Sequence, residues 1–191
     1  TAAGGAERCR IEVGSYVSAV VTFVDPATGE LRVACGCFDK KVRIYDPVAG
    51  GAALVVIDDV AAFALAVFKD PATGELRLAC AAGEQVRIYD PVAGGEALLV
   101  LDGRGRLAVF TDPATGAPRL ACGGKIFDPV AGGEALLVLD VSAGELAVFT
   151  DQATGAPRLA CVSEGEGKNT TERRNKTRVV VLDPVEGGDA L

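Results

Sequence analysis

The chain has 191 residues, of which 49% are hydrophobic and 24% are charged, and this balance favours a packed core over disorder. The net charge of −7 argues against broad binding to nucleic acid or anionic membranes, and no apolar run approaches the roughly 18 residues of a membrane helix. The sequence contains no His, which excludes Ser-His-Asp and Cys-His nucleophiles and His-ligated metals. We therefore expect no enzyme, no cofactor and no metal site.

Two turn motifs alternate along the chain. Asp-Pro-Val-Ala-Gly-Gly stands at 46–51, 90–95 and 128–133, and Asp-Pro-Val-Glu-Gly-Gly at 183–188. Asp-Pro-Ala-Thr-Gly stands at 25–29, 70–74 and 112–116, and Asp-Gln-Ala-Thr-Gly at 151–155. In most of them the Asp side chain can hold the turn, Pro presets the backbone and Gly supplies a positive φ, so each motif predicts a β-hairpin.

Four units of short strands, named d, a, b and c, follow in chain order within a single domain, 1–191. The units are expected at about 1–45, 46–89, 90–127 and 128–182. Unit one is predicted to have strand d within 1–15 and strands a, b and c at about 17–24, 31–35 and 41–45. The corresponding ranges are 52–58, 62–68, 76–80 and 85–89 in unit two, 96–101, 106–111, 118–122 and 125–127 in unit three, and 134–139, 145–150, 157–161 and 178–182 in unit four.

The six cysteines have the number but not the pattern of a disulfide framework. Cys35, Cys80, Cys122 and Cys161 occupy one position in four repeats, each after Arg-(Val/Leu)-Ala. A repeated position favours a small core residue over a disulfide framework. On strand b the residues Leu76, Leu78 and Cys80 alternate onto one face, which we expect to pack between neighbouring sheets.

Successive Asp-Pro-Ala-Thr-Gly-type turns begin 45, 42 and 39 residues apart, a period typical of propeller blades. The chain resembles a degenerate WD-repeat β-propeller, and the Trp-Asp that ends strand c in this family is matched by Tyr45-Asp46, Tyr89-Asp90, Phe127-Asp128 and, more weakly, Leu182-Asp183. The Gly-His pair of the family and its Trp are missing, and its b–c turn Asp survives only near Asp39. The family's buried Asp-His-Ser-Trp network therefore cannot form.

The resemblance predicts an all-β propeller with four blades of four antiparallel strands. An N-terminal d strand could pair with the last a-b-c sheet and close a four-bladed ring, which would remove exposed edges. Two alternatives are a half-ring that dimerises to eight blades and a part of a larger propeller.

The a–b and c–d turns should ring one face of a propeller. This face collects Asp25, Asp46, Asp70, Asp90, Asp112, Asp128, Asp151 and Asp183, which we interpret as turn caps rather than a cation site or an acidic docking surface. The repeated strand-b arginines are expected to pair with these carboxylates, the alternative being a ring that binds sugar or phosphate; they are Arg32, Arg77, Arg119 and Arg158.

The opposite face, with the b–c and d–a loops, varies between units and is the predicted binding face. Five basic residues in and directly after its long b–c insertion, 162–177, are proposed to bind a partner. They are Lys168, Arg173, Arg174, Lys176 and Arg178. The alternative is a solvated insertion with no role. Asn169 and Asn175 are glycosylation acceptors that would be used only if the chain is secreted.

By family analogy the leading function is a non-catalytic protein-protein interaction scaffold, which implies a protein partner, a cytoplasmic location, no nucleic acid and no membrane insertion. One alternative is an extracellular structural or carbohydrate-binding glycoprotein. Another is a fragment or subunit of a larger assembly, and a homodimer is one form that this assembly could take.

Overall fold

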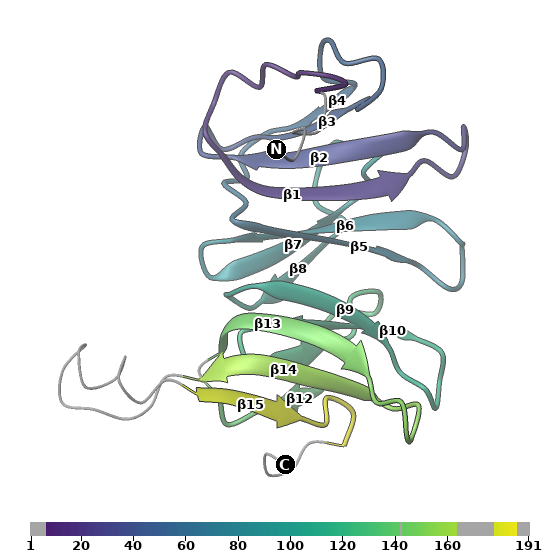
Figure 1. The fold of residues 1–191 in the computed structure, drawn as a ribbon, viewed down its shortest axis with the longest axis vertical. Helices are drawn as coiled ribbons and strands as arrows, with labels where there is room; N and C mark the ends of the chain where they lie inside the picture. Colours follow the sequence, from purple (N-terminus) through teal and green to yellow (C-terminus); the bar gives the residue numbers. More distant parts are fainter. Residues whose placement is uncertain (1–6, 142, 164–177, 187–191) are drawn as a thin grey trace, which may run out of the picture.

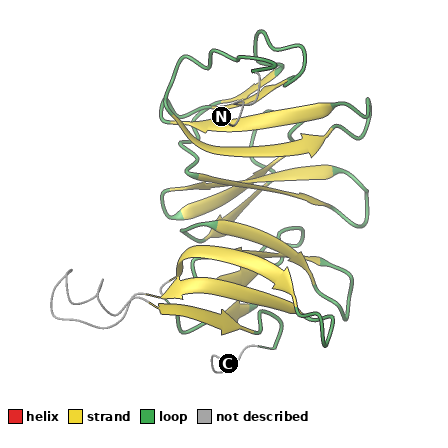
Figure 2. Ribbon diagram, viewed as in Figure 1, coloured by secondary structure: helices red, strands yellow, loops and turns green. Residues whose placement is uncertain are grey.

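The computed structural model describes residues 7–141, 143–163 and 178–186. Every helix or strand among them is a β-strand (Figure 2). The described residues contain no helix of the length and apolar character that crossing a membrane requires.

In the described residues fifteen strands form four antiparallel sheets, which we call A to D in chain order (Figure 1). Sheet A contains β1 (Val17–Val24), β2 (Leu31–Cys37), β3 (Val42–Tyr45) and β4 (Val55–Ile57). Sheet B contains β5 (Ala64–Lys69), β6 (Leu76–Ala82), β7 (Gln85–Tyr89) and β8 (Leu99–Asp102). Sheet C contains β9 (Leu107–Thr111), β10 (Pro118–Cys122), β11 (Lys125–Phe127) and β12 (Leu137–Val138). Sheet D contains β13 (Ala143–Thr150), β14 (Pro157–Ser163) and β15 (Arg178–Leu182).

Each strand pairs with the next one along the chain, so strands a, b, c and d lie in that order across a sheet. The d strand that follows a c–d turn completes the preceding a-b-c sheet: Val55 of β4, for example, lies opposite Ile44 of β3. Sheets A, B and C therefore have the four antiparallel strands that the sequence predicts. Sheet D has three strands within the described ranges.

The turn motifs set the register of the hairpins. In the first a–b turn the Gly29 amide donates to the Asp25 carbonyl over 2.8 Å, and Gly29 has a φ of 73°. The two-residue b–c hairpin of sheet C is Gly123-Gly124, with φ angles of 55° and 87°, between the paired residues Cys122 and Lys125. Positive φ at both central residues is the geometry that matches strand twist.

The core lies between successive sheets, as the alternation on strand b predicts. Phe23, Ala34 and Ile44 of sheet A pack against Leu78, Cys80 and Tyr89 of sheet B. The same repeat positions meet between sheets B and C and between sheets C and D. One packing arrangement is thus used three times, and strands β1, β5, β9 and β13 lie side by side in that order.

All six cysteines lie in described parts of the chain, and all six are free thiols. Cys35, Cys80, Cys122 and Cys161 are buried, so the interpretation of a repeated core position is confirmed and a disulfide framework is wrong. Burial raises the pKa of the Cys122 thiol to about 11 and that of Cys80 still further. These thiols are packing groups and stay protonated at neutral pH.

Residues 7–15, the described part of the predicted N-terminal d strand, have no strand structure. They cross sheet A instead, where Ile11 and Val13 pack on Cys35, Cys37 and Tyr45. Sheets A and D lie at opposite ends of the stack (Figure 1). Since residues 7–15 stay on sheet A, they do not pair with β15, and the described parts of the four sheets do not close a ring.

Candidate functional site

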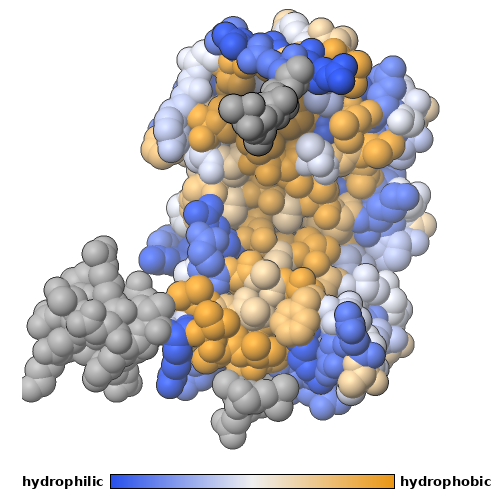
Figure 3. Space-filling model, in the orientation of Figure 1, coloured by the Kyte–Doolittle hydropathy of each residue, from blue (hydrophilic) through white to orange (hydrophobic). Residues whose placement is uncertain are grey.

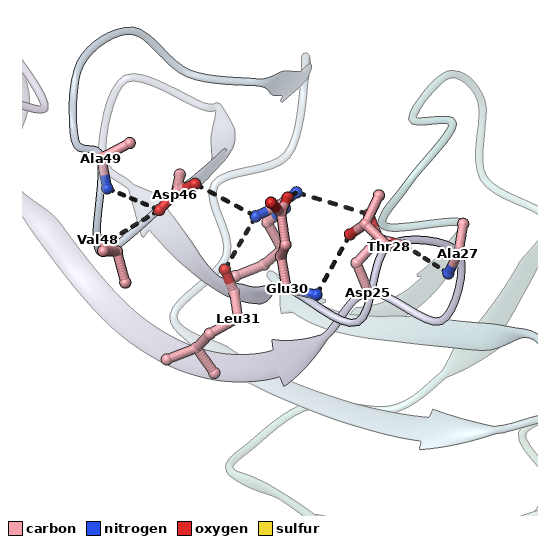
Figure 4. A network of polar contacts seen from close by, with 9 residues as sticks. Asp25, Ala27, Thr28, Glu30, Leu31, Asp46, Val48 and Ala49 are labelled. Atoms are coloured by element: carbon pink, nitrogen blue, oxygen red, sulfur yellow. Dashed lines mark hydrogen bonds and ion pairs between the residues drawn. The ribbon is translucent and has the colours of Figure 1, made fainter.

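The turn face is organised by carboxylates that accept backbone hydrogen bonds (Figure 4). In the first c–d turn, Oδ1 of Asp46 accepts from the amides of Val48 and Ala49, both over 2.8 Å. In the first a–b turn, Oδ1 of Asp25 accepts from the Ala27 amide over 2.9 Å. These bonds favour the charged form, so the backbone amides lower the pKa of Asp25 and of Asp46 below the usual range.

In sheets A, C and D a strand-b arginine pairs with carboxylates of both turns, whereas Arg77 of sheet B pairs with the a–b turn alone. The Arg32 guanidinium lies 3.8 Å from the Asp25 carboxylate and 3.5 Å from that of Asp46. Arg119 lies 3.0 Å from Asp112 and 3.2 Å from Asp128. The same ion pairs recur at Arg77 with Asp70 and at Arg158 with Asp151 and Asp183. The predicted pairing of the four arginines with turn carboxylates is confirmed.

The turn carboxylates therefore have structural partners. The described residues hold no group of three or more acidic or Cys side chains that could bind a metal ion. The turn face therefore stabilises the fold, and the candidate binding site lies on the opposite face.

The loop face carries a groove of about 1060 Å³. Its lining comes from the segment before β1, the b–c turns and the d–a loops, so it crosses all four sheets. Its lining includes the side chains of Tyr16, Phe38, Phe63, Arg104, Arg106 and Asp140. This is the face that the sequence marks as variable.

An exposed aromatic pair forms one end of the groove. The rings of Tyr16 and Phe38 meet edge to face with centroids 4.9 Å apart, although these residues are 72% and 68% exposed. The b–c turn holds Phe38 in place, since its amide donates to the Tyr16 carbonyl over 3.0 Å. In the same turn Asp39 pairs with Arg43 over 2.6 Å, and this hydrogen bond lowers the pKa of the Asp39 carboxyl.

Two arginines of the d–a loop between sheets B and C form the middle of the groove. Arg106 donates to the Phe63 carbonyl over 3.1 Å and to Glu145 over 3.0 Å. Arg104 pairs with Glu84 over 2.9 Å, with side chains 74% and 71% exposed. Exposed ion pairs of this kind contribute little to stability, so both guanidinium groups can exchange these carboxylates for those of a partner.

A glycine lets this loop approach the b–c turn of sheet C. A Cβ atom on Gly123 would overlap the Arg104 carbonyl oxygen, which no side chain tolerates. The glycine hairpin therefore does two things: it closes β10 onto β11 and it leaves room for the Arg104–Arg106 backbone.

Of the residues that the sequence predicts for partner binding, Arg178 alone is described. It is the exposed first residue of β15 and lies opposite Ser163. Lys168, Arg173, Arg174 and Lys176, together with the acceptors Asn169 and Asn175, lie outside the described residues. The sequence reasoning missed the groove, although Gly103-Arg-Gly-Arg106 is a visible departure from the repeat in the d–a loop.

No family model matches the chain, and no curated protein matches it. Solved structures do. BBS1N, crystallised in complex with ARL6DN, matches in a lead-soaked form with a TM-score of 0.63 and 15% identity, over 94% of this chain and 56% of that one. The mercury-soaked form gives a TM-score of 0.61 and 14% identity over 92% and 53%. The biofilm matrix protein Bap1 of V. cholerae gives a TM-score of 0.56 and 12% identity over 93% and 39%.

The likeness to BBS1N, a β-propeller, shows a β-propeller kind of fold for this chain. The chain spans about half the length of the BBS1N chains it matches. An open stack of four sheets is consistent with a match to about half of a longer propeller chain.

Proposed function

We propose that this chain is a non-catalytic interaction scaffold of the WD-repeat type that binds a protein partner through its loop face. The observation that supports this most is the groove formed by Tyr16, Phe38 and Phe63 beside Arg104 and Arg106. Aromatic residues and Arg are the types enriched at protein interfaces and at their energetic hot spots.

The WD-type assignment rests on the ends of the c strands. Tyr45, Tyr89, Phe127 and Leu182 stand where that family has its Trp, and they are 3%, 3%, 1% and 4% exposed. Each is followed by the Asp that begins a c–d turn. An aromatic or large aliphatic side chain thus fills the place of the Trp without the polar network of the family.

The non-catalytic assignment rests on the reactive groups that the sequence provides. The chain has no His, and burial raises the pKa of the repeated thiols. The turn carboxylates are engaged with backbone amides and arginines. A pairing of nucleophile and base, which acyl or phosphoryl transfer requires, has no candidate in these groups.

The structural neighbours support a binding role by analogy. BBS1N was solved in complex with ARL6DN, so a propeller of similar fold binds a protein. Fold alone does not determine function, and the proposal for this chain depends on its own groove.

Partner capture with matched variants tests the proposal. The double variant Tyr16→Ala/Phe38→Ala removes two exposed rings, and Val100→Ala on β8, 48% exposed, is the control outside the groove. Truncating hot-spot residues costs at least about 1 kcal/mol each. We expect a protein that the parent chain and Val100→Ala both retain, and whose affinity for the double variant is at least about tenfold weaker. Equal retention by all three would contradict the assignment to this groove.

The basic residues of 168–178 and the secreted glycoprotein alternative stay predictions. Asn169 and Asn175 decide between the two compartments, because their glycans require secretion. Glycopeptide analysis of natively sourced protein distinguishes these cases: occupied acceptors favour the glycoprotein, and unmodified ones favour the scaffold.

A further inference from the structure

The two ends of the sheet stack are unlike the interior. Every inner sheet presents one face to the sheet before it and the other face to the sheet after it. Within the described residues, sheet D has no sheet after it and sheet A has none before it (Figure 1). The repeats allow each end residue to be compared with its buried equivalents.

The free face of sheet D is built like a buried one. The strand-a phenylalanine is 6%, 5% and 6% exposed at Phe23, Phe68 and Phe110, but 46% exposed at Phe149. On strand c, Val42 and Val86 are both fully buried, whereas Val179 is 70% exposed. Figure 3 shows apolar side chains gathered over the viewed face of β13–β15.

On the free side of sheet A, too, an apolar residue is more exposed than its equivalents in the other sheets. The c–d turn valine is 42%, 39% and 38% exposed at Val92, Val130 and Val185, where a preceding sheet shields it, but 81% exposed at Val48. The pocket beside Val92 is lined by Phe23 of the preceding sheet. Val48 would meet Phe149 if a sheet D lay before sheet A.

Residues 7–12 already sit where the outer strand of such a preceding sheet would lie. A methyl group on Gly94 would lie 2.8 Å from Val55 of β4, and one on Gly132 would lie 2.6 Å from Leu99 of β8. The equivalent Gly50 has Cys9 at 3.1 Å. Cys9 thus takes the place of the outer-strand residues Val55 and Leu99, although no c strand lies beside it.

Strand β15 is an edge strand of sheet D, because no outer d strand pairs with it among the described residues. In sheet A, Val55 lies opposite Ile44, and Asp58 forms a 2.7 Å ion pair with Lys41. The same register on β15 sets Cys9 opposite Val181. It also sets Glu12 opposite Arg178, a carboxylate against a guanidinium.

The geometry points to a second copy of this chain as the occupant of both ends. Sheet D of each copy packs on sheet A of the other, and residues 9–12 of each copy add a fourth strand to β15 of its partner. Two half-rings then close an eight-sheet ring with two equivalent interfaces, which leaves no open edge. A second copy fits because it carries both repeat faces and the outer-strand segment. This inference does not depend on the groove of the loop face.

A designed cross-link tests the register. Val181→Cys places a thiol opposite Cys9 of the partner, where the Cα separation of about 4.5–5.5 Å between directly opposite residues lies within the range that a disulfide spans. Val138→Cys is the control, since Val138 is 68% exposed on an inner sheet. Under mild oxidation we expect Val181→Cys to give a dimer linked through Cys9, whereas Val138→Cys does not. A Val181→Cys chain that forms no disulfide-linked dimer would overturn the proposed pairing of residues 9–12 with β15.

Native mass spectrometry tests the assembly itself. The parent chain is expected at twice 19.5 kDa, and Phe149→Glu is expected as a monomer with an unchanged circular dichroism spectrum, because the exposed ring is not needed for folding. Val138→Glu should remain dimeric. A monomeric parent chain, a Phe149→Glu dimer as stable as that of the parent, or an open series of higher oligomers would each overturn the inference.

Discussion

At the scale of single residues, the turn aspartates stabilise the hairpin turns. Asp70 is 8% exposed, accepts a hydrogen bond from the Ala72 amide over 2.9 Å and lies 3.8 Å from Arg77. The equivalent aspartates make the same contacts in the other sheets, so each accepts a hydrogen bond from one turn amide and adds a carboxylate to the ion pairs of a strand-b arginine.

We expect Asp70→Ala to lower the free energy of unfolding by about 1.5–3 kcal/mol, the range for hydrogen bonds to charged groups. Asp58→Ala is the matched control, because the pair of Asp58 with Lys41 is exposed, with side chains 63% and 41% accessible, and should change stability by less than about 1 kcal/mol. Urea denaturation measures both. Equal losses for the two variants would contradict a special role for the turn carboxylate.

The same carboxylates predict an acid-labile fold. Backbone amides lower the pKa of Asp25, Asp46, Asp112 and Asp151 in the folded state, while an unfolded Asp titrates at about 3.9. A depressed folded pKa adds stability that is complete above the unfolded value and is lost as the pH falls through the folded value. Denaturation at stepped pH should show a plateau above about pH 5 and a steady loss below about pH 4. Stability that is flat to pH 2 would argue against the caps.

At the scale of elements, the c strands of sheets B, C and D anchor each of these sheets against the preceding one. Tyr89 ends β7 and packs with Leu78 and Cys80 in the core shared with sheet A. Burial raises the pKa of its hydroxyl. The strands themselves were predictable, since apolar runs on either side of the two Asp-Pro turn motifs specify hairpins locally. The d strands are shorter than expected, because the two or three residues after each c–d turn extend the loop before pairing begins.

Tyr89→Ala should cost about 3–5 kcal/mol, as buried aromatic truncations do. Tyr16→Ala removes the same side chain at a position that is 72% exposed, and it should leave the unfolding midpoint almost unchanged. If both variants unfold alike, the placement of β7 between two sheets is wrong.

At the scale of the whole molecule, repetition fixes how sheets stack but not how the stack ends. The strand order and the packing of Cys80 and its equivalents were predictable from the sequence, because the same residue pattern recurs in every repeat. It did not predict that residues 7–15 remain on sheet A, since Cys9 and Ile11 alternate as well as any outer strand. Nor did it predict the groove, which depends on Tyr16, Phe38 and Arg106 meeting from three separate loops.

The central claim is that the loop face, and not the turn face, binds a protein partner. Hydrogen–deuterium exchange of the captured complex against the free chain measures this directly, because exchange reports local protection residue by residue. We predict slowed exchange at 38–41, 103–106 and 140–145, with the turns at 25–30, 70–75 and 112–117 unchanged. Protection confined to the turns, or spread evenly over the sheets, would contradict the account.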